Sequence, residues 1–193
     1  MARWLLVLAG YVIGACPTAY LFGQRLKGKD IRQLGDGNMG ARNAYHELGH
    51  KTGILIFFID AAKGSLAVLL CILFHAPQYI TLTAGAAAVA GHNWPVFLGF
   101  RGGRGEATTI GILIVLLPLS VLIAAVPAFA VLLIRKNVIL ASAVFFVLLL
   151  LVNWWRHVPG ILVFYAVALP IAVGLTHFSR VWHPHRTVGN GGM

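Results

Sequence analysis

The feature that most constrains this chain is a series of long apolar segments interrupted by short basic ones. A helix of about 20 apolar residues crosses the roughly 30 Å hydrocarbon core of a bilayer, with its backbone polar groups satisfied internally. Five segments approach that length and composition, at residues 4–23, 53–74, 79–100, 138–155 and 159–179. The pattern predicts an all-α integral membrane protein whose single domain covers residues 1–193.

Composition argues against the usual soluble classes. Of 193 residues, 59% are hydrophobic and 10% are charged, whereas soluble chains carry about 25% charged residues. The net charge of +10 lies mostly between apolar segments, where cations orient membrane spans, so nucleic-acid binding is not expected. Cys16 and Cys71 lie inside apolar runs and the five acidic residues form no ligand cluster, so neither a disulfide nor a metal is expected. The first run lacks a signal-peptide cleavage pattern and is interpreted as a span.

An uncharged run at residues 107–134 is long for one span and short for two, and it contains Pro118 and Pro127. If it turns near Pro118 as a helical hairpin, the chain has seven crossings, with 12 Lys or Arg on one side against Arg3 and Arg156 on the other. With six crossings the division is nine against five. Because cytoplasmic loops carry the excess of Lys and Arg, we predict seven transmembrane helices, with the N-terminus outside and the C-terminus cytoplasmic.

The first polar segment, at residues 35–43, reads GDGNMGARN and follows the first span. Its three glycines permit positive φ angles that let backbone N–H groups converge on an anion, and Asn38, Arg42 and Asn43 add side-chain donors. These features are typical of a phosphate-binding loop. The same residue types also occur in a flexible loop whose asparagines cap helices, and the pattern alone does not decide between the two.

The second polar segment reads GHNWPVF at residues 91–97 and FRGGRGEAT at residues 100–108, directly before an apolar helix. Backbone donors at that helix N-terminus and the Arg104 guanidinium would face one place, which suits a phosphate. Alternatively, Arg101 and Arg104 only fix topology and contact lipid headgroups. A single histidine in the place of His92 is more often a hydrogen bonder that orients its helix than a base or a metal ligand.

Asp60 and Lys63 are ionisable residues inside the second span, three positions apart and so on one helical face. Charges inside a membrane helix are costly, and they pair with each other or line a polar cavity. The two side chains therefore either neutralise each other or form a supporting wall of an active site.

At these motifs the chain resembles the bacterial membrane-bound acyl-phosphate:glycerol-3-phosphate acyltransferases, which are seven-span enzymes of the inner membrane. The family motif Gly-Ser-Gly-Asn-x-Gly-Ala-Thr-Asn is matched over residues 35–43, and Phe-x-Asp-x-x-Lys-Gly over residues 58–64. The motif Gly-His-x-x-Pro-Val-Phe, followed by Phe-Lys-Gly-Gly-Lys-Gly-Val-Ala-Thr, is matched over residues 91–108, and Ser142 falls on a substrate-binding serine. The resemblance implies transfer of a fatty acyl group from acyl phosphate to the 1-hydroxyl of glycerol 3-phosphate, giving lysophosphatidic acid and phosphate. It implies substrate-assisted chemistry without a side-chain nucleophile.

The resemblance also implies roles for individual residues. Catalytic roles fall on Asp36, Asn38 and Arg104. Substrate-binding roles fall on Gly37, Gly40, Arg42, Asn43, His46, Lys63, His92, Gly102, Gly103, Ser142 and His185. No cofactor is implied, the partners are the two substrates and membrane lipids, and the expected form is a monomer in the inner membrane with its active site on the cytoplasmic side.

Among the departures from the family pattern, four matter for the expected site: Asp36 replaces a phosphate-binding serine, Arg42 a threonine, His46 an arginine and Arg104 a lysine. At about 4 Å, a carboxylate opposes a phosphate oxygen by about 4 kcal/mol per unit charge pair at an effective dielectric near 20. Asp36 is therefore expected to turn away, to be protonated or to act as a base toward the attacking hydroxyl. At the C-terminus His185 is taken as the counterpart of a substrate-binding histidine, and the family's asparagine has no counterpart.

Two other functions fit parts of the pattern. A diverged, non-catalytic membrane paralogue would bind a phosphorylated ligand or lipid, and Asp36 is the position that separates this hypothesis from an enzyme. A small transporter or channel would account for seven spans but not for two phosphate-type loops on one membrane face. The acyltransferase is therefore the function predicted from the sequence.

Overall fold

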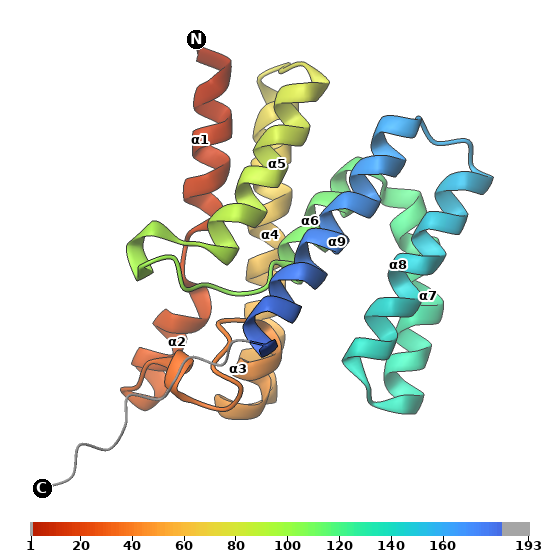
Figure 1. Ribbon diagram of the computed structural model, residues 1–193. Helices are drawn as coiled ribbons and strands as arrows, with labels where there is room; N and C mark the ends of the chain where they lie inside the picture. The colour runs from red at the N-terminus through yellow and green to blue at the C-terminus, as the bar shows by residue number, and fades with distance from the viewer. Residues whose placement is uncertain (1, 183–193) are drawn as a thin grey trace, which may run out of the picture.

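The computed structural model describes residues 2–182, and over this range the fold contains helices and no strand (Figure 1). In chain order the elements are α1 (Ala2–Gly14), α2 (Thr18–Lys27), the 3-10 helix η1 (Ile31–Gln33), α3 (Ala41–Glu47), α4 (His50–Leu73), α5 (Gln78–Asn93), the 3-10 helix η2 (Val96–Leu98), α6 (Glu106–Leu116), α7 (Pro118–Arg135), α8 (Val138–Trp155) and α9 (Gly160–Trp182). The predicted all-α class is confirmed for the described residues.

Four helical stretches are long and apolar enough to cross a membrane. They are Arg3–Lys27, His50–Leu73, Pro118–Arg135 and Val138–Trp155, and the apolar helices Glu106–Leu116 and Gly160–Thr176 are shorter. Many large apolar side chains point outward, and Ile134 of α7 is 78% exposed. Apolar side chains on the outside of membrane-length helices are compatible with contact with the lipid acyl chains of a bilayer.

The first apolar run is not the continuous span expected at residues 4–23, because the chain breaks between α1 and α2. Pro17 stands in the break and has no N–H to donate to the preceding turn. The Lys63 Nζ of α4 donates a hydrogen bond to the Cys16 carbonyl oxygen at 2.7 Å. A buried lysine from another helix thus satisfies the backbone where the helix is interrupted.

The third apolar run also differs from its expected extent at residues 79–100. Helix α5 ends at Asn93, the chain then turns at Pro95, and the short helix η2 follows. The reason is local, since a residue before proline is disfavoured in helical conformation. Residues 94–105 consequently form a loop rather than the last turns of a span.

The uncharged run at residues 107–134 divides into two helices, as the hairpin interpretation expected. Leu117 leaves the helical region with φ −137° and ψ 51°, and Pro118 starts α7 at its first position, where a missing N–H has no cost. In Figure 1, α6 and α7 run toward and away from the same turn. Pro127 is accommodated inside α7.

Helix α7 continues into α8 through a very short turn. Lys136 adopts a left-handed conformation (φ 50°) that ends α7, and the Asn137 side chain caps α8 by accepting a hydrogen bond from the Leu140 N–H at 3.1 Å. A cluster that includes Leu113 of α6 and Phe145 of α8 joins this hairpin to the rest of the bundle.

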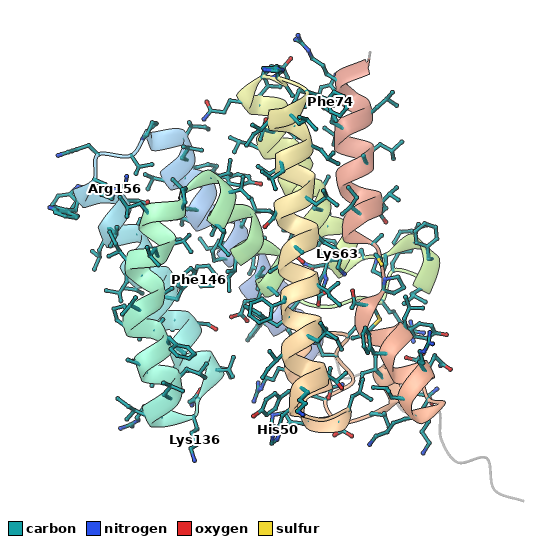
Figure 2. All side chains as sticks on the ribbon, turned by 180° about the vertical axis from the view of Figure 1, so that it is seen from behind. His50, Lys63, Phe74, Lys136, Phe146 and Arg156 are labelled. Carbon is teal, nitrogen blue, oxygen red and sulfur yellow. The ribbon has the colours of Figure 1, made fainter. Side chains whose placement is uncertain are left out.

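The turn between α7 and α8 lies at the same end of the molecule as the start of α4. Figure 2 shows His50 and Lys136 at that end, and Phe74 and Arg156 toward the opposite end. We call the end marked by His50 and Lys136 the site end, because the first polar segment, which leads into α3, lies toward it.

Helices α4 and α6 approach so closely that their backbones touch. A Cβ added to Gly111 of α6 would collide with the Ala61 carbonyl of α4, and one added to Gly64 would collide with the Thr108 carbonyl. Helices α1 and α5 pack in the same way, with Gly14 against the Ala88 carbonyl. Small residues permit such contacts in lipid, where dispersion rather than water exclusion holds helices together.

We expect Gly111→Leu to destabilise the protein, because the new side chain has no space beside Ala61 and must separate α4 from α6. Overpacking of this kind costs about 1–3 kcal/mol. Thermal denaturation in one detergent measures the change. Gly160→Ala is the matched control, since a Cβ there meets nothing within 4 Å; equal melting temperatures for the two variants would contradict the close contact.

Candidate active site

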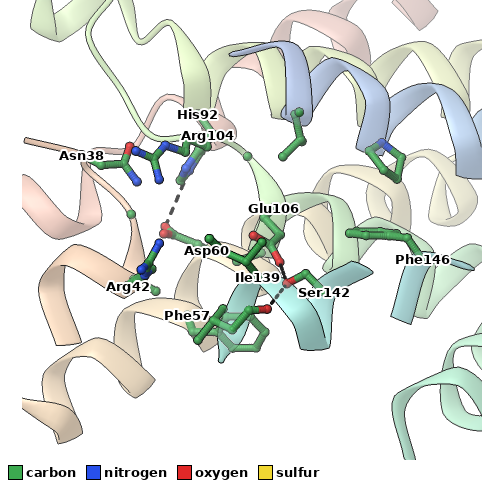
Figure 3. Close-up of a pocket in the computed structure, with 18 of the residues that line it drawn as sticks. Asn38, Arg42, Phe57, Asp60, His92, Arg104, Glu106, Ile139, Ser142 and Phe146 are labelled. Atoms are coloured by element: carbon green, nitrogen blue, oxygen red, sulfur yellow. Dashed lines mark hydrogen bonds and ion pairs between the residues drawn. The ribbon is translucent and has the colours of Figure 1, made fainter. Parts of the chain in front are cut away.

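A cavity of about 320 Å³ lies between α4, α6, α8 and α9, close to the site end (Figure 3). Its polar wall comes from both polar segments and its apolar wall from α4, α8 and α9. It is lined by Asn38, Gly40, Ala41, Arg42, Phe57, Asp60, His92, Arg104, Gly105, Glu106, Ala107, Val138, Ile139, Ser142, Ala143, Phe146, Pro170, Val173 and Gly174.

A second cavity of about 430 Å³ adjoins the first and shares Arg42, Arg104 and Ile139 with it. Its other lining residues are Gly35, Asp36, Asn43, His46 and Glu47. Two arginine side chains therefore stand where the two cavities meet.

The segment between η1 and α3 is held in shape by one buried side chain, Asn43. Its Nδ2 donates hydrogen bonds to the carbonyl oxygens of Ile31 (3.3 Å), Leu34 (2.9 Å) and Asn38 (3.0 Å), and its Oδ1 accepts one from the Asp36 N–H (3.2 Å). Because all these contacts are to backbone, Asn43 organises the segment rather than presenting itself to a ligand.

Glycines let this segment fold back on Asn43. Gly35 and Gly37 have φ angles of +55° and +69°, which other residues rarely adopt. A Cβ at Gly35 would collide with the Asn43 Oδ1, and one at Gly40 would lie 2.7 Å from the Asn38 Nδ2. The Gly37 N–H donates to the Leu34 carbonyl at 3.0 Å, so this amide is used within the loop.

Asp36 pairs with Arg104 across the two polar segments. Its Oδ2 lies 3.3 Å from the Arg104 Nη2, and its Oδ1 accepts a hydrogen bond from the Asn38 N–H at 3.1 Å. The Asp36 side chain is 41% exposed and that of Arg104 is 16% exposed. The Asp36 carboxylate thus pairs with one nitrogen of the Arg104 guanidinium, which an anionic ligand would also bind.

Two buried polar atoms in the cavity wall have no protein partner among the described residues. They are the Oδ1 of Asn38 and the Nε of Arg104. A buried donor and a buried acceptor left unpaired are costly, so atoms of this kind commonly await a ligand or water. Arg42 is exposed and forms no ion pair with any described residue.

The glycines of the second polar segment do not offer their amides to the cavity. The Gly102 N–H donates to the Asn93 carbonyl (3.1 Å) and the Gly103 N–H to the His92 carbonyl (3.0 Å). A Cβ at Gly103 would collide with the His92 imidazole. These glycines fold the loop back on the end of α5 and thereby position Arg104. Their backbone N–H groups were expected to bind phosphate, but they bond to carbonyl groups of α5 instead.

Arg32 of η1, just before the first polar segment, contacts η2, which lies between the two parts of the second. Its guanidinium donates to both Asp30 carboxylate oxygens and to the Leu98 carbonyl at 3.0 Å, and it lies over the Tyr20 ring at 5.6 Å. Burial alone would raise the pKa of Asp30, but the hydrogen bonds and charge of Arg32 outweigh it and hold that pKa below its ordinary value. The two segments are thus linked outside the cavity as well as across it.

Asp60 and Lys63 form the intrahelical pair that their spacing indicated. Lys63 Nζ lies 2.6 Å from the Asp60 Oδ1, and His92 Nδ1 lies 3.9 Å from the same oxygen. Asp60 and His92 line the cavity, whereas Lys63 faces the Cys16 carbonyl and does not. Lys63 therefore supports the scaffold instead of facing the cavity.

Sequence reasoning missed one polar residue of the cavity, Glu106 in the first turn of α6. The Ser142 hydroxyl of α8 donates a hydrogen bond to the Glu106 Oε1, and Ser142 Oγ also lies 2.9 Å from the Val138 carbonyl oxygen. The signal was available, because Glu106 is one of only five acidic residues and stands where the family motif has valine.

The structure separates the expected site residues into groups. Lining the 320 Å³ cavity are Asn38, Gly40, Arg42, His92, Arg104 and Ser142. Lining only the adjoining cavity are Asp36, Asn43 and His46. Lining neither are Gly37, Lys63, Gly102 and Gly103. His185 lies outside the described residues.

Known proteins similar to this chain share one description. A family model described as glycerol-3-phosphate acyltransferase matches residues 4–184. Glycerol-3-phosphate acyltransferase 4 of Dehalococcoides mccartyi is 48% identical over 176 residues, covering 91% of this chain and 95% of the relative. A glycerol-3-phosphate acyltransferase of Halalkalibacterium halodurans is 34% identical over 184 residues, covering 92% and 89%.

The fold is also similar to a solved membrane protein. The crystal structure of PlsY (YgiH), an integral membrane glycerol 3-phosphate acyltransferase in its glycerol 3-phosphate form, matches with a TM-score of 0.84 and 29% identity over 95% of this chain and 92% of that one. The lysophosphatidic acid form of the same protein matches with a TM-score of 0.79 and 27% identity, covering 95% and 91%.

Proposed function

This chain belongs to the glycerol-3-phosphate acyltransferase family, and on that premise we propose that it transfers a fatty acyl group from acyl phosphate to the 1-hydroxyl of glycerol 3-phosphate. The products are lysophosphatidic acid and inorganic phosphate, and the reaction belongs to phospholipid biosynthesis. Acyl phosphate as the donor is part of the proposal.

The observation that carries the proposal is the placement of Arg42 and Arg104 where two cavities meet. The reaction brings two phosphate groups together, one on each substrate, and such a pair needs cations close to both. Guanidinium groups bind phosphate with two parallel hydrogen bonds, which adds geometric specificity to charge. Asn38 contributes a buried polar side chain to the same wall.

An apolar wall beside the arginines supports a lipid substrate. Phe57 of α4, Ile139 and Phe146 of α8 and Val173 of α9 line the same cavity (Figure 3). An acyl chain buried against such side chains gains about 0.8 kcal/mol for each CH₂ group removed from water. The cavity thus combines a cationic end for phosphate with an apolar side for a fatty acyl chain.

No side-chain nucleophile is needed in the proposed reaction. The 1-hydroxyl attacks the acyl carbonyl carbon, the carbon–oxygen bond to phosphate breaks, and the departing phosphate takes the electron pair and the hydroxyl proton. Holding both reactants in line removes a large part of the barrier, and a cation placed at the developing charge removes more. Arg104, which is mostly buried, is the residue we assign to that charge.

For the membrane arrangement we propose seven crossings, an outer N-terminus, a cytoplasmic C-terminus and a monomer in the inner membrane. Lys136 and the first polar segment, next to α3, lie toward the site end, while Arg156 lies toward the other end. Since cytoplasmic ends carry the excess of basic residues, this division supports a cytoplasmic active site.

A non-catalytic paralogue is the second candidate, and the Asp36–Arg104 ion pair favours it. A carboxylate 3.3 Å from the guanidinium competes with a substrate phosphate for the same cation. Such a protein would hold a phosphorylated ligand weakly or not at all while Asp36 remains ionised.

A membrane assay separates the two functions. Membranes containing the protein receive labelled glycerol 3-phosphate with synthetic acyl phosphate or, in parallel, acyl-coenzyme A, and labelled lysophosphatidic acid is measured. We expect labelled product in the reaction with acyl phosphate and none in the reaction with acyl-coenzyme A. Product with acyl-coenzyme A would overturn the proposed donor, and no product with either would favour the paralogue.

We expect Arg104→Ala to lose most activity, since removal of one charge-stabilising donor in a catalytic site costs about 3–4 kcal/mol. Arg104→Lys keeps the charge and should retain part of the rate. Arg101→Ala, in the same loop but exposed and away from both cavities, is the matched control. Wild-type turnover by Arg104→Ala would leave Arg104 as a topology residue only.

Asp36→Ser should lower the KM for acyl phosphate, because it releases Arg104 and removes a repulsion from the bound phosphate. A gain of 1.4 kcal/mol appears as about a tenfold change in a binding constant. Michaelis parameters of both proteins in the same membranes measure it. A lower kcat would instead identify Asp36 as a base, and unchanged parameters would show that Asp36 does not face the substrate.

A further inference from the structure

Glu106 places a carboxylate in the cavity wall opposite its arginines. It stands in the first turn of α6, where the helix N-terminus favours a negative charge. Figure 3 shows Glu106 and Ser142 together on one side of the cavity, with Arg42 and Arg104 on the other. The Ser142 hydroxyl has one proton and two acceptors in reach, Glu106 Oε1 and the Val138 carbonyl oxygen; donated to Oε1, that proton holds this carboxylate oxygen against α8.

The second carboxylate oxygen, Oε2, is not engaged. No hydrogen bond or ion pair from residues 2–182 reaches it, although the Glu106 side chain is only partly exposed and lines the cavity. A carboxylate accepts hydrogen bonds at both oxygens and has no proton to give when ionised. The cavity therefore presents one carboxylate oxygen that receives no hydrogen bond from residues 2–182.

The chemistry of that acceptor selects which part of a ligand can face it. A phosphate is repelled by a carboxylate, and an acyl chain offers no donor, but a hydroxyl group donates well. Glycerol 3-phosphate carries one phosphate and two hydroxyls, so its phosphate suits the arginine side and its hydroxyls suit Glu106. The family motif has valine at this position, so the motif itself supplies no such acceptor.

Of the two hydroxyls, the one on C2 is the better partner. The C1 hydroxyl gives up its proton when the ester forms, and in the proposed reaction that proton goes to the departing phosphate. The C2 hydroxyl keeps its proton from the bound substrate to the product. A fixed acceptor can hold it throughout.

We propose that Glu106 is a specificity-determining residue whose Oε2 accepts a hydrogen bond from the C2 hydroxyl of glycerol 3-phosphate, with Ser142 as its positioning residue. This inference rests on the proposed function, because it takes the acceptor substrate from it.

The test compares two acceptors, glycerol 3-phosphate and 3-hydroxypropyl phosphate, which has the same phosphate and reacting hydroxyl but no C2 hydroxyl. The ratio of their kcat/KM values is measured for the wild type, Glu106→Val and Glu106→Gln. We expect the wild type to prefer glycerol 3-phosphate and Glu106→Val to lose about tenfold or more of that preference, as for one hydrogen bond to a charged group. Glu106→Gln retains an acceptor oxygen without the charge and should lie between them.

A purely structural bridge between α6 and α8 would give a different result. Its loss would lower kcat/KM for both acceptors equally and leave their ratio unchanged, which would overturn the proposal. If Glu106→Val does not fold, the nearly isosteric Glu106→Gln carries the same comparison. A wild type without turnover would overturn the proposed function and this inference together, whereas active variants with wild-type selectivity would overturn this inference alone.

Discussion

The backbone contact between α4 and α6 sets the position of everything around the cavity. Gly64 and Gly111 bring the two helices together without intervening side chains, so the start of α6 stands at a fixed height beside Asp60. Arg104 and Glu106 flank that start and share the cavity with Asp60. Because membrane helices are held by packing rather than by water exclusion, a small change at this contact would move both charged side chains at once.

The family motifs indicate an excess of positive charge at the cavity, but in this chain acidic side chains offset much of it. Arg42 and Arg104 supply two cations, but Asp36 pairs with Arg104 and Glu106 faces the same space. Lys63, which the motif places nearby, is committed to Asp60 and to the interrupted helix at Cys16. In the proposed reaction, an anionic substrate competes with Asp36 for the Arg104 guanidinium.

Much of the architecture could be predicted from residue patterns. The break at Leu117 followed from a 28-residue uncharged run with a proline, and the structure places it there. The interruption at Pro17 was not predicted, and Lys63 of another helix supports it by donating to the Cys16 carbonyl, which also accepts the Thr18 N–H. At the site, Asn38, Arg104 and Ser142 were site residues by resemblance and line one cavity, whereas Glu106 was not predicted because a carboxylate does not suit a phosphate-binding loop.

The sequence by itself determined the helical class, the membrane-length segments and the identity of the two polar loops, since these depend on local composition and on short-range spacing. Tertiary structure decided which groups remain available to a ligand. The amides of Gly102 and Gly103 are consumed by carbonyls at the end of α5, and Asn43 is consumed by the loop it organises. A polar group is available to a ligand only if no protein group already bonds to it, and the competing protein groups come from other elements of the chain. Only the folded arrangement of those elements could leave Arg42 and Glu106 facing the cavity.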